Sequence, residues 1–154
     1  MRTLCILLCI PLFLFSACNK LPTTATDLLA DLVSLPSISP PDADIYFAQG
    51  APESQLDTIL GDLYGAEADM LLRLADYAVF LGRSTTLYEI HILRAVSAAD
   101  VPALRRVLEA RAKLLCLATE EGHPTKPNAI VYETGDLLFL FATPHNDVLQ
   151  ASVR

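Results

Sequence analysis

Residues 75–96 read ADYAVFLGRSTTLYEIHILRAV, and they carry the clearest signal for the architecture of the chain. It holds two runs rich in aromatic and β-branched residues, ADYAVFLG and TLYEIHILRAV, with the polar letters GRST between them. Runs of this composition, bounded by glycine and serine, are typical of strands joined by a tight connection. The stretch therefore predicts an antiparallel pair of strands in the middle of the chain.

Side chains alternate in character along the second of these runs. Successive side chains of a strand point to opposite faces of the sheet. Two sets follow: Tyr88, Ile90, Ile92 and Val96 on one face, and Glu89, His91 and Leu93 on the other. The first face is apolar and the second is mixed, as in an antiparallel sheet that is covered on one side only.

A second strand pair is expected near the C-terminus. Residues 128–133 (NAIVYE) and 137–143 (LLFLFAT) flank the turn letters TGD. Glycine followed by aspartate between two apolar runs favours a short hairpin loop. Residues 146–152 (NDVLQAS) follow Pro144 and are expected to form a short last helix.

The longest predicted helix runs from about 98 to 120. Ser97 and Asp100 resemble a capping box at its start, and Gly122 ends it. Its apolar residues step by three and four, which is the spacing of one helix face. They are Val101, Leu104, Leu108, Ala112 and Leu115.

Two further helices are expected before the first hairpin, over 27–35 with Thr26 as the cap and over 52–64 with Gly65 as the stop. Pro40 and Pro41 separate them. The order predicts an α+β fold. Its sheet has four antiparallel strands from two β-hairpins, and the long helix and the N-terminal helices pack on one face.

The first 17 residues have the layout of an export signal. Arg2 supplies a positive charge, residues 4–15 form an apolar centre of 12 residues, and Ser16 and Ala17 are small. A spanning helix needs about 20 apolar residues, so this segment is short for an anchor. The boundary FSAC, residues 15–18, resembles the cleavage box of bacterial lipoprotein signals, in which small residues precede an obligatory cysteine.

That resemblance implies cleavage between Ala17 and Cys18 and acylation of the Cys18 thiol. Phe15 departs from the leucine usual at the first position of the box. The alternatives are an ordinary secretory signal cut near Ala17 and an uncleaved anchor, and both leave the position of Cys18 unexplained. The expected organisation is a signal peptide over 1–17, a tether over 18–26 and a single domain over 27–154.

Charge and cysteine usage exclude several classes of protein. All 18 acidic residues and 10 of the 11 basic residues lie from Cys18 onward, so this portion carries a formal charge of −8. Such a surface repels phosphate backbones, and nucleic-acid binding is not expected. Cys116 is the one cysteine after Cys18, so an internal disulfide is excluded. Its apolar neighbours, KLLCLA, favour a buried small side chain over a reactive thiol.

The order of short segments also resembles a known group. LYG at the end of a helix, DYAVFLGRST, YEIHILRAV, RRVLEARAKL and NAIVYETGDLLFLFAT follow one another over about 56–143. This order resembles the small bacterial lipoproteins grouped as domain-of-unknown-function family 4358. The resemblance implies an acidic residue at the start of the second strand, here Glu89, and a recurring arginine in the long helix, here Arg111. It implies a fold and a location but no activity.

Glu89 and His91 form the strongest candidate for chemistry. They lie two apart on a strand and so share a face, and with His123 or His145 they offer ligands for a transition metal. The alternative is an ion pair on a solvated sheet face. Neither a nucleophile motif nor a glycine-rich phosphate loop is present, and Glu120 and Glu121 are typical of a solvated helix end.

The long helix carries a cluster of positive charge. Its basic residues are Arg105, Arg106, Arg111 and Lys113. Pairs such as Arg105 and Glu109 lie four apart, which is ordinary support for a helix. A functional interpretation would direct this basic strip at anionic headgroups, wall polymers or an acidic partner; the alternative is a solvated face.

The sequence therefore predicts a lipid-anchored protein of the bacterial cell envelope, on the outer side of the cell membrane. We expect no enzymatic activity, no catalytic or metal-binding residue and no cofactor. The expected partners are the membrane, through a lipid such as palmitate on Cys18, and an envelope protein or wall polymer. The alternative is an envelope enzyme or metal-binding protein that uses Glu89 and His91.

Overall fold

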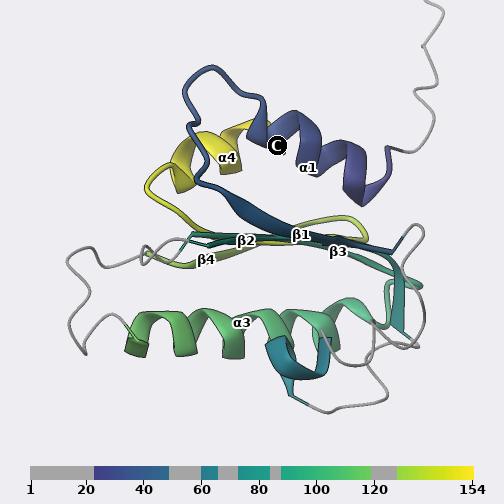
Figure 1. The fold of residues 1–154 in the computed structure, drawn as a ribbon. Helices are drawn as coiled ribbons and strands as arrows, with labels where there is room; N and C mark the ends of the chain where they lie inside the picture. The colour runs from purple at the N-terminus through teal and green to yellow at the C-terminus, as the bar shows by residue number, and fades with distance from the viewer. Residues whose placement is uncertain (1–22, 49–59, 66–72, 84–87, 119–127) are drawn as a thin grey trace, which may run out of the picture.

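Five antiparallel strands form one sheet at the centre of the computed structural model (Figure 1). The structure describes residues 23–48, 60–65, 73–83, 88–118 and 128–154. The elements with full bounds are α1 (Ala25–Val33), β1 (Ala43–Phe47), β2 (Leu74–Gly82), β3 (Glu89–Ala95), α3 (Val101–Ala118), β4 (Ile130–Thr134), β5 (Leu137–Ala142) and α4 (Asn146–Ser152). Residues 60–64 are also helical.

The strands lie in the order β1-β2-β3-β5-β4. Both predicted hairpins are confirmed, because β2 pairs with β3 and β4 pairs with β5, all antiparallel. The hairpins join through β3 and β5, where His91 lies opposite Leu140. The mixed α+β class and the terminal helix α4 are confirmed as well.

The predicted number of strands was wrong. Strand β1 adds a fifth strand at the edge of the sheet, where Ile45 lies opposite Phe80 of β2. It spans five residues, and one residue separates it from the proline pair, for which the sequence predicted only a break between helices. A single short run without a hairpin partner beside it in sequence gives a weak strand signal, because pairing with β2 comes from residues about 35 positions later.

The expectation of helices on one face was also wrong, because both faces of the sheet are covered. Helices α1 and α4 lie on one side and α3 on the other, together with residues 60–64 (Figure 1). On β3, Ile90 and Ile92 belong to the hydrophobic core between the sheet and helices α1 and α4, whereas Leu93 belongs to the core between the sheet and α3. All three side chains are 0% exposed. The mixed face can be buried because its polar side chains, Glu89 and His91, have hydrogen-bond partners beneath α3.

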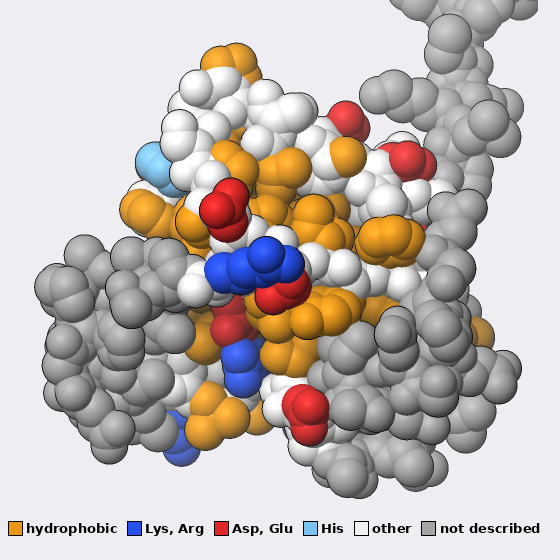
Figure 2. Space-filling model, in the orientation of Figure 1, with side chains coloured by type: hydrophobic (Ala, Val, Ile, Leu, Met, Phe, Trp, Pro, Cys, Tyr) orange, Lys and Arg blue, Asp and Glu red, His pale blue; other side chains and the backbone are white. Residues whose placement is uncertain are grey.

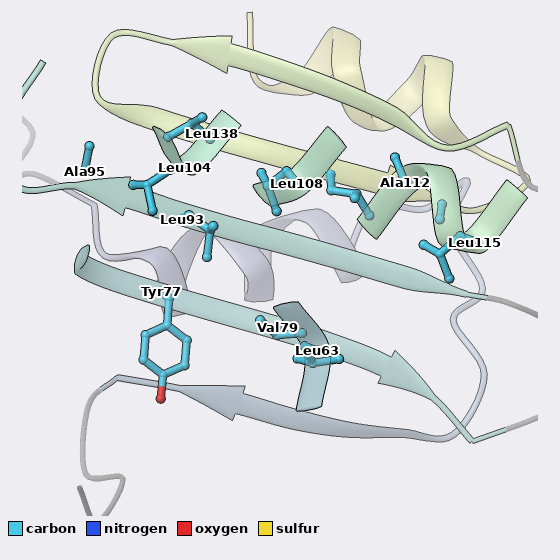
Figure 3. Packing of buried hydrophobic residues seen from close by; sticks show 12 residues of the cluster. Leu63, Tyr77, Val79, Leu93, Ala95, Leu104, Leu108, Ala112, Leu115 and Leu138 are labelled. Atoms are coloured by element: carbon cyan, nitrogen blue, oxygen red, sulfur yellow. The ribbon is translucent and has the colours of Figure 1, made fainter. Parts of the chain in front are cut away.

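The apolar stripe of α3 packs on the sheet as the spacing predicted (Figure 3). Leu104 and Leu108 are completely buried against residues such as Leu93 and Leu138. Full burial of one leucine side chain is worth about 1.5–3 kcal/mol, so this stripe holds the long helix on the sheet. Cys116 was expected to be buried, but it is exposed. It follows Leu115, and one residue rotates a helix position by about 100° away from the buried face.

Two local predictions on the other elements were wrong. The cap of α1 is Thr24 rather than Thr26: its hydroxyl accepts from the Asp27 N–H at 3.1 Å, and the Asp27 carboxylate accepts from the Thr24 N–H at 3.2 Å. Helix α1 therefore begins at Ala25. Val96 is 59% exposed, because β3 ends at Ala95 and the alternation ends with it.

No helix in the described ranges has both the length and the apolar character required to cross a bilayer. The sheet lies between two layers of helix (Figure 1).

The loop between β4 and β5 depends on Gly135, whose φ is +63°. A two-residue loop with glycine first matches a type II′ turn.

We predict that Gly135→Ala destabilises the protein by about 1–2 kcal/mol. A Cβ is strained at positive φ, and because nothing lies within 4 Å of the Cβ position, no contact offsets that strain. Gly61→Ala is the matched control: its site is equally open but helical, so this change is expected to stabilise by about 0.5–1 kcal/mol. Urea unfolding of the two variants measures both signs, and equal effects would contradict the turn assignment.

Candidate functional site

Four polar side chains meet between the sheet and α3. They come from three elements: Tyr64 from the helical residues 60–64, Glu89 and His91 from β3, and Arg111 from α3. We call them the buried quartet. His91 is completely buried and Glu89 is 7% exposed.

The carboxylate of Glu89 is the centre of the buried quartet. The Arg111 guanidinium donates to both carboxylate oxygens, from Nη2 to Oε1 at 2.6 Å and from Nε to Oε2 at 3.1 Å. Such a two-point pair fixes orientation as well as charge. His91 Nε2 lies 2.8 Å from Glu89 Oε2. An ionised carboxylate only accepts, so Nε2 carries the proton and donates it.

Tyr64 completes the chain on the other side of the imidazole. Its hydroxyl bonds to His91 Nδ1, and the two rings meet edge to face with centroids 5.5 Å apart. Because Nε2 holds the imidazole proton, Nδ1 accepts and the phenol donates. The bond ties residues 60–64 to the sheet.

Local structure explains how these residues meet. Glu89 and His91 share the α3-facing side of β3, and His91 lies in register with Val79 on β2 and Leu140 on β5. The stripe of α3 rests on the same side of the sheet, which brings Arg111 over Glu89. The resemblance to family 4358 singled out Glu89 and Arg111 but did not pair them; in the structure they form one ion pair.

The pKa values of the quartet follow from burial and partners. Burial alone would raise the pKa of Glu89, but the hydrogen bonds from His91 and Arg111 outweigh it and lower that pKa from 4.5 to about 2. Burial lowers the pKa of His91, against the opposing effect of Glu89. Burial and the neighbouring Glu89 charge raise the pKa of Tyr64. At neutral pH the quartet therefore holds a carboxylate, a neutral imidazole, a phenol and a guanidinium.

This arrangement does not suit the alternative function that we assigned to Glu89 and His91. Both imidazole nitrogens are used, so a metal ion or a substrate proton reaches His91 only if a bond to Tyr64 or Glu89 breaks. His145 directly precedes α4, on the other side of the sheet. Across the described ranges no three histidine, cysteine or acidic residues are grouped for a metal. His123, Glu120 and Glu121 lie outside the described residues.

The predicted basic strip on α3 is not one surface. Arg105 pairs with Glu109 at 2.8 Å, as its spacing predicted, and also with Glu133 of β4 at 2.9 Å. Arg111 turns inward to the quartet. Arg106 is exposed beside a hollow, and Lys113 is exposed further along the helix. The strip was inferred from sequence proximity, whereas the helix directs these side chains to different sides.

A hollow of about 280 Å³ borders the quartet. It lies against the first half of α3 and is lined by Tyr64, Arg73, Ala103, Leu104, Arg106, Val107 and Ala110. Two basic side chains line the hollow. Arg73 forms an ion pair with Asp100 at 2.9 Å, and Arg106 is the other. The sequence did not predict this hollow, because its wall joins residues about 40 positions apart. Tyr64 was also missed; its place one residue before the helix stop Gly65 was the available signal.

The chain enters the domain at a well-fixed point, which we call the N-terminal junction. Arg94 Nη2 donates to the Thr23 carbonyl at 2.6 Å, and the Ala25 N–H donates to the Asp76 carboxylate at 2.6 Å. Arg94 is held in turn by Asp136 at 3.2 Å. The junction thus rests on β2, β3 and the β4–β5 loop. Cys18 and Ala17 lie outside the described residues.

Comparison with known proteins adds no relative. No family model, no curated protein and no solved structure matches the chain.

Proposed function

We propose that this chain is a lipoprotein of the bacterial cell envelope, anchored through lipid on Cys18 and displayed on the outer side of the cell membrane. The observation that supports it is the position of Cys18. It follows an apolar leader and two small residues directly, and only five residues separate it from Thr24, the cap of the first helix.

The distance between Cys18 and the N-terminal junction suits an anchor. Residues 19–23 can span at most about 17 Å when fully extended. A lipid on Cys18 would therefore hold the domain close to the headgroups, with the junction facing the membrane. One acyl chain binds a bilayer only weakly, whereas two or three chains hold a protein of this size firmly.

The proposed molecular role is contact with another envelope protein or a wall polymer, without catalysis. In the part of the chain that the structure describes, the buried quartet is a set of four ionisable side chains under α3 whose hydrogen bonds are directed at one another. Such a network orients secondary-structure elements and leaves no group ready to act on a substrate. The exposed surface is then the part of the domain that meets a partner.

Cys18→Ala tests the anchor. We expect cells that are fed radiolabelled palmitate to label the wild-type protein and to leave Cys18→Ala unlabelled, because the variant lacks the thiol that is acylated. Cys116→Ser is the matched control and should be labelled like the wild type, since Cys116 lies on the exposed side of α3. Equal labelling of the wild type and Cys18→Ala would rule out the proposal.

A further inference from the structure

The two edges of the sheet differ in their protection. On β4, the exposed Glu133 carries a charge that pairs with Arg105. On β1, Ile45 is 49% exposed and Phe47 is 37% exposed. Figure 2 shows hydrophobic side chains on the face where β1 lies nearest the viewer, with acidic and basic side chains among them. Each edge strand carries one acidic residue whose charge is paired within the chain, Glu133 on β4 and Asp44 on β1. Of these two described edges β1 alone also exposes large apolar side chains, so β1 is the edge that favours pairing with another strand.

The main-chain groups of β1 that point away from β2 belong to the same residues. The Ala48 N–H donates to the Tyr77 carbonyl at 3.1 Å, and the Arg83 N–H donates to the Asp42 carbonyl at 2.8 Å. Because bonding alternates along an antiparallel strand, Ala43, Ile45 and Phe47 direct their N–H and C=O groups away from β2. Backbone and apolar side chains therefore offer one pairing surface.

We propose that this edge pairs with β1 of a second copy of the chain, antiparallel about a two-fold axis at Ile45. The two sheets then form one continuous sheet across the dimer. In this register Ile45 lies opposite Ile45 of the second copy, and the small Ala43 lies opposite the large Phe47. On the other face Asp44 lies opposite Tyr46.

The sequence of β1 favours this register over its neighbours. Moving the axis to residue 44 would place two Asp44 carboxylates directly opposite one another, and like charges in that position are destabilising. Moving it to residue 46 would leave Ala43 and Asp44 without partners. In the register centred on Ile45 all five residues are paired, and each Asp44 already pairs with its own Arg83. Most homo-oligomers are two-fold dimers, which need a surface complementary to itself, and β1 provides one.

Cysteine cross-linking of the full-length protein in its native membranes tests the register. In a Cys116→Ser background, Ile45→Cys is expected to form a disulfide-linked dimer on mild oxidation. Directly opposed residues of a hydrogen-bonded pair have Cα atoms about 5.5 Å apart, which is within the range of a disulfide.

Phe47→Cys is the matched control on the same strand. Its two copies would be offset by four residues, about 13 Å along the strand, and cannot be bridged. The double variant Ala43→Cys/Phe47→Cys should cross-link again, because those positions are opposed. This pattern supports the dimer, and the comparison does not depend on lipid at Cys18. Equal cross-linking at 45 and 47, no dimer above the Cys116→Ser background from either Ile45→Cys or the double variant, or a disulfide to a different protein would overturn it.

Discussion

Arg111→Met is expected to cost about 3 kcal/mol of the free energy of unfolding. The change leaves the Glu89 carboxylate buried with its largest opposite charge removed, and breaking a buried ion pair on one side typically costs about 3–5 kcal/mol. The lower end applies because the Arg111 side chain is 20% exposed. Urea unfolding of the protein from residue 19 onward at pH 7 measures the loss.

Arg105→Met is the matched control for this prediction. It also removes an arginine of α3 that pairs with glutamates, but those pairs lie on the surface, so a loss of at most about 1 kcal/mol is expected. The double variant Glu89→Gln/Arg111→Met should be more stable than Arg111→Met alone, because it buries no charge and the amide oxygen still accepts from His91. If both arginine variants lose equal stability, the quartet does not hold α3 on the sheet.

Acidification is expected to destabilise the protein in two steps. His91 has a lower pKa in the folded protein than its ordinary 6.5, so the unfolded chain binds more protons and stability falls as the pH drops below about 6.5. Glu89 has a folded pKa of about 2 against its ordinary 4.5, so its contribution is complete above 4.5 and is lost as the pH falls toward 2. The Glu89 step amounts to roughly 3 kcal/mol.

The measurement is the free energy of unfolding at pH steps from 7.5 to 2.5. Glu89→Gln removes the carboxylate, so its curve should lie lower at neutral pH and should lack the Glu89 contribution below 4.5. Asp44→Asn is a matched control, because Asp44 forms its ion pair on the exposed edge. Its curve should stay close to that of the wild type. A Glu89→Gln curve parallel to the wild type below pH 4.5 would contradict the role of the carboxylate.

The local signals along the sequence predicted most of the elements. Both hairpins, the stripe of α3 and the terminal helix follow from periodicity and turn residues, which are properties of neighbouring positions. The missed strand β1 and the second covered face depend on partners distant in the sequence. Glu89 and His91 were assigned to the correct face, but their polarity indicated solvent, whereas Arg111 and Tyr64 make that face suitable for burial.

The candidate site was predictable only in part. The alternation placed Glu89 and His91 side by side, and the resemblance to family 4358 drew attention to Arg111. These residues share one network because α3 crosses β3 at the position of Glu89. The spacing of residues along the chain does not encode that crossing point. The four basic residues of α3 are close in sequence but do not form one surface, because the helix directs their side chains to different sides.

The N-terminal junction determines which contacts bear a force that is applied to the N-terminal end of this domain. A pull on the chain before Thr23 first reaches the Arg94 contact at the Thr23 carbonyl, and then the Asp76 contact at Ala25, the first residue of α1. Those contacts belong to β3 and β2, two adjacent inner strands of the sheet. Force on the proposed anchor would therefore spread into two inner strands of the sheet, and α1 would be protected from unwinding from its end.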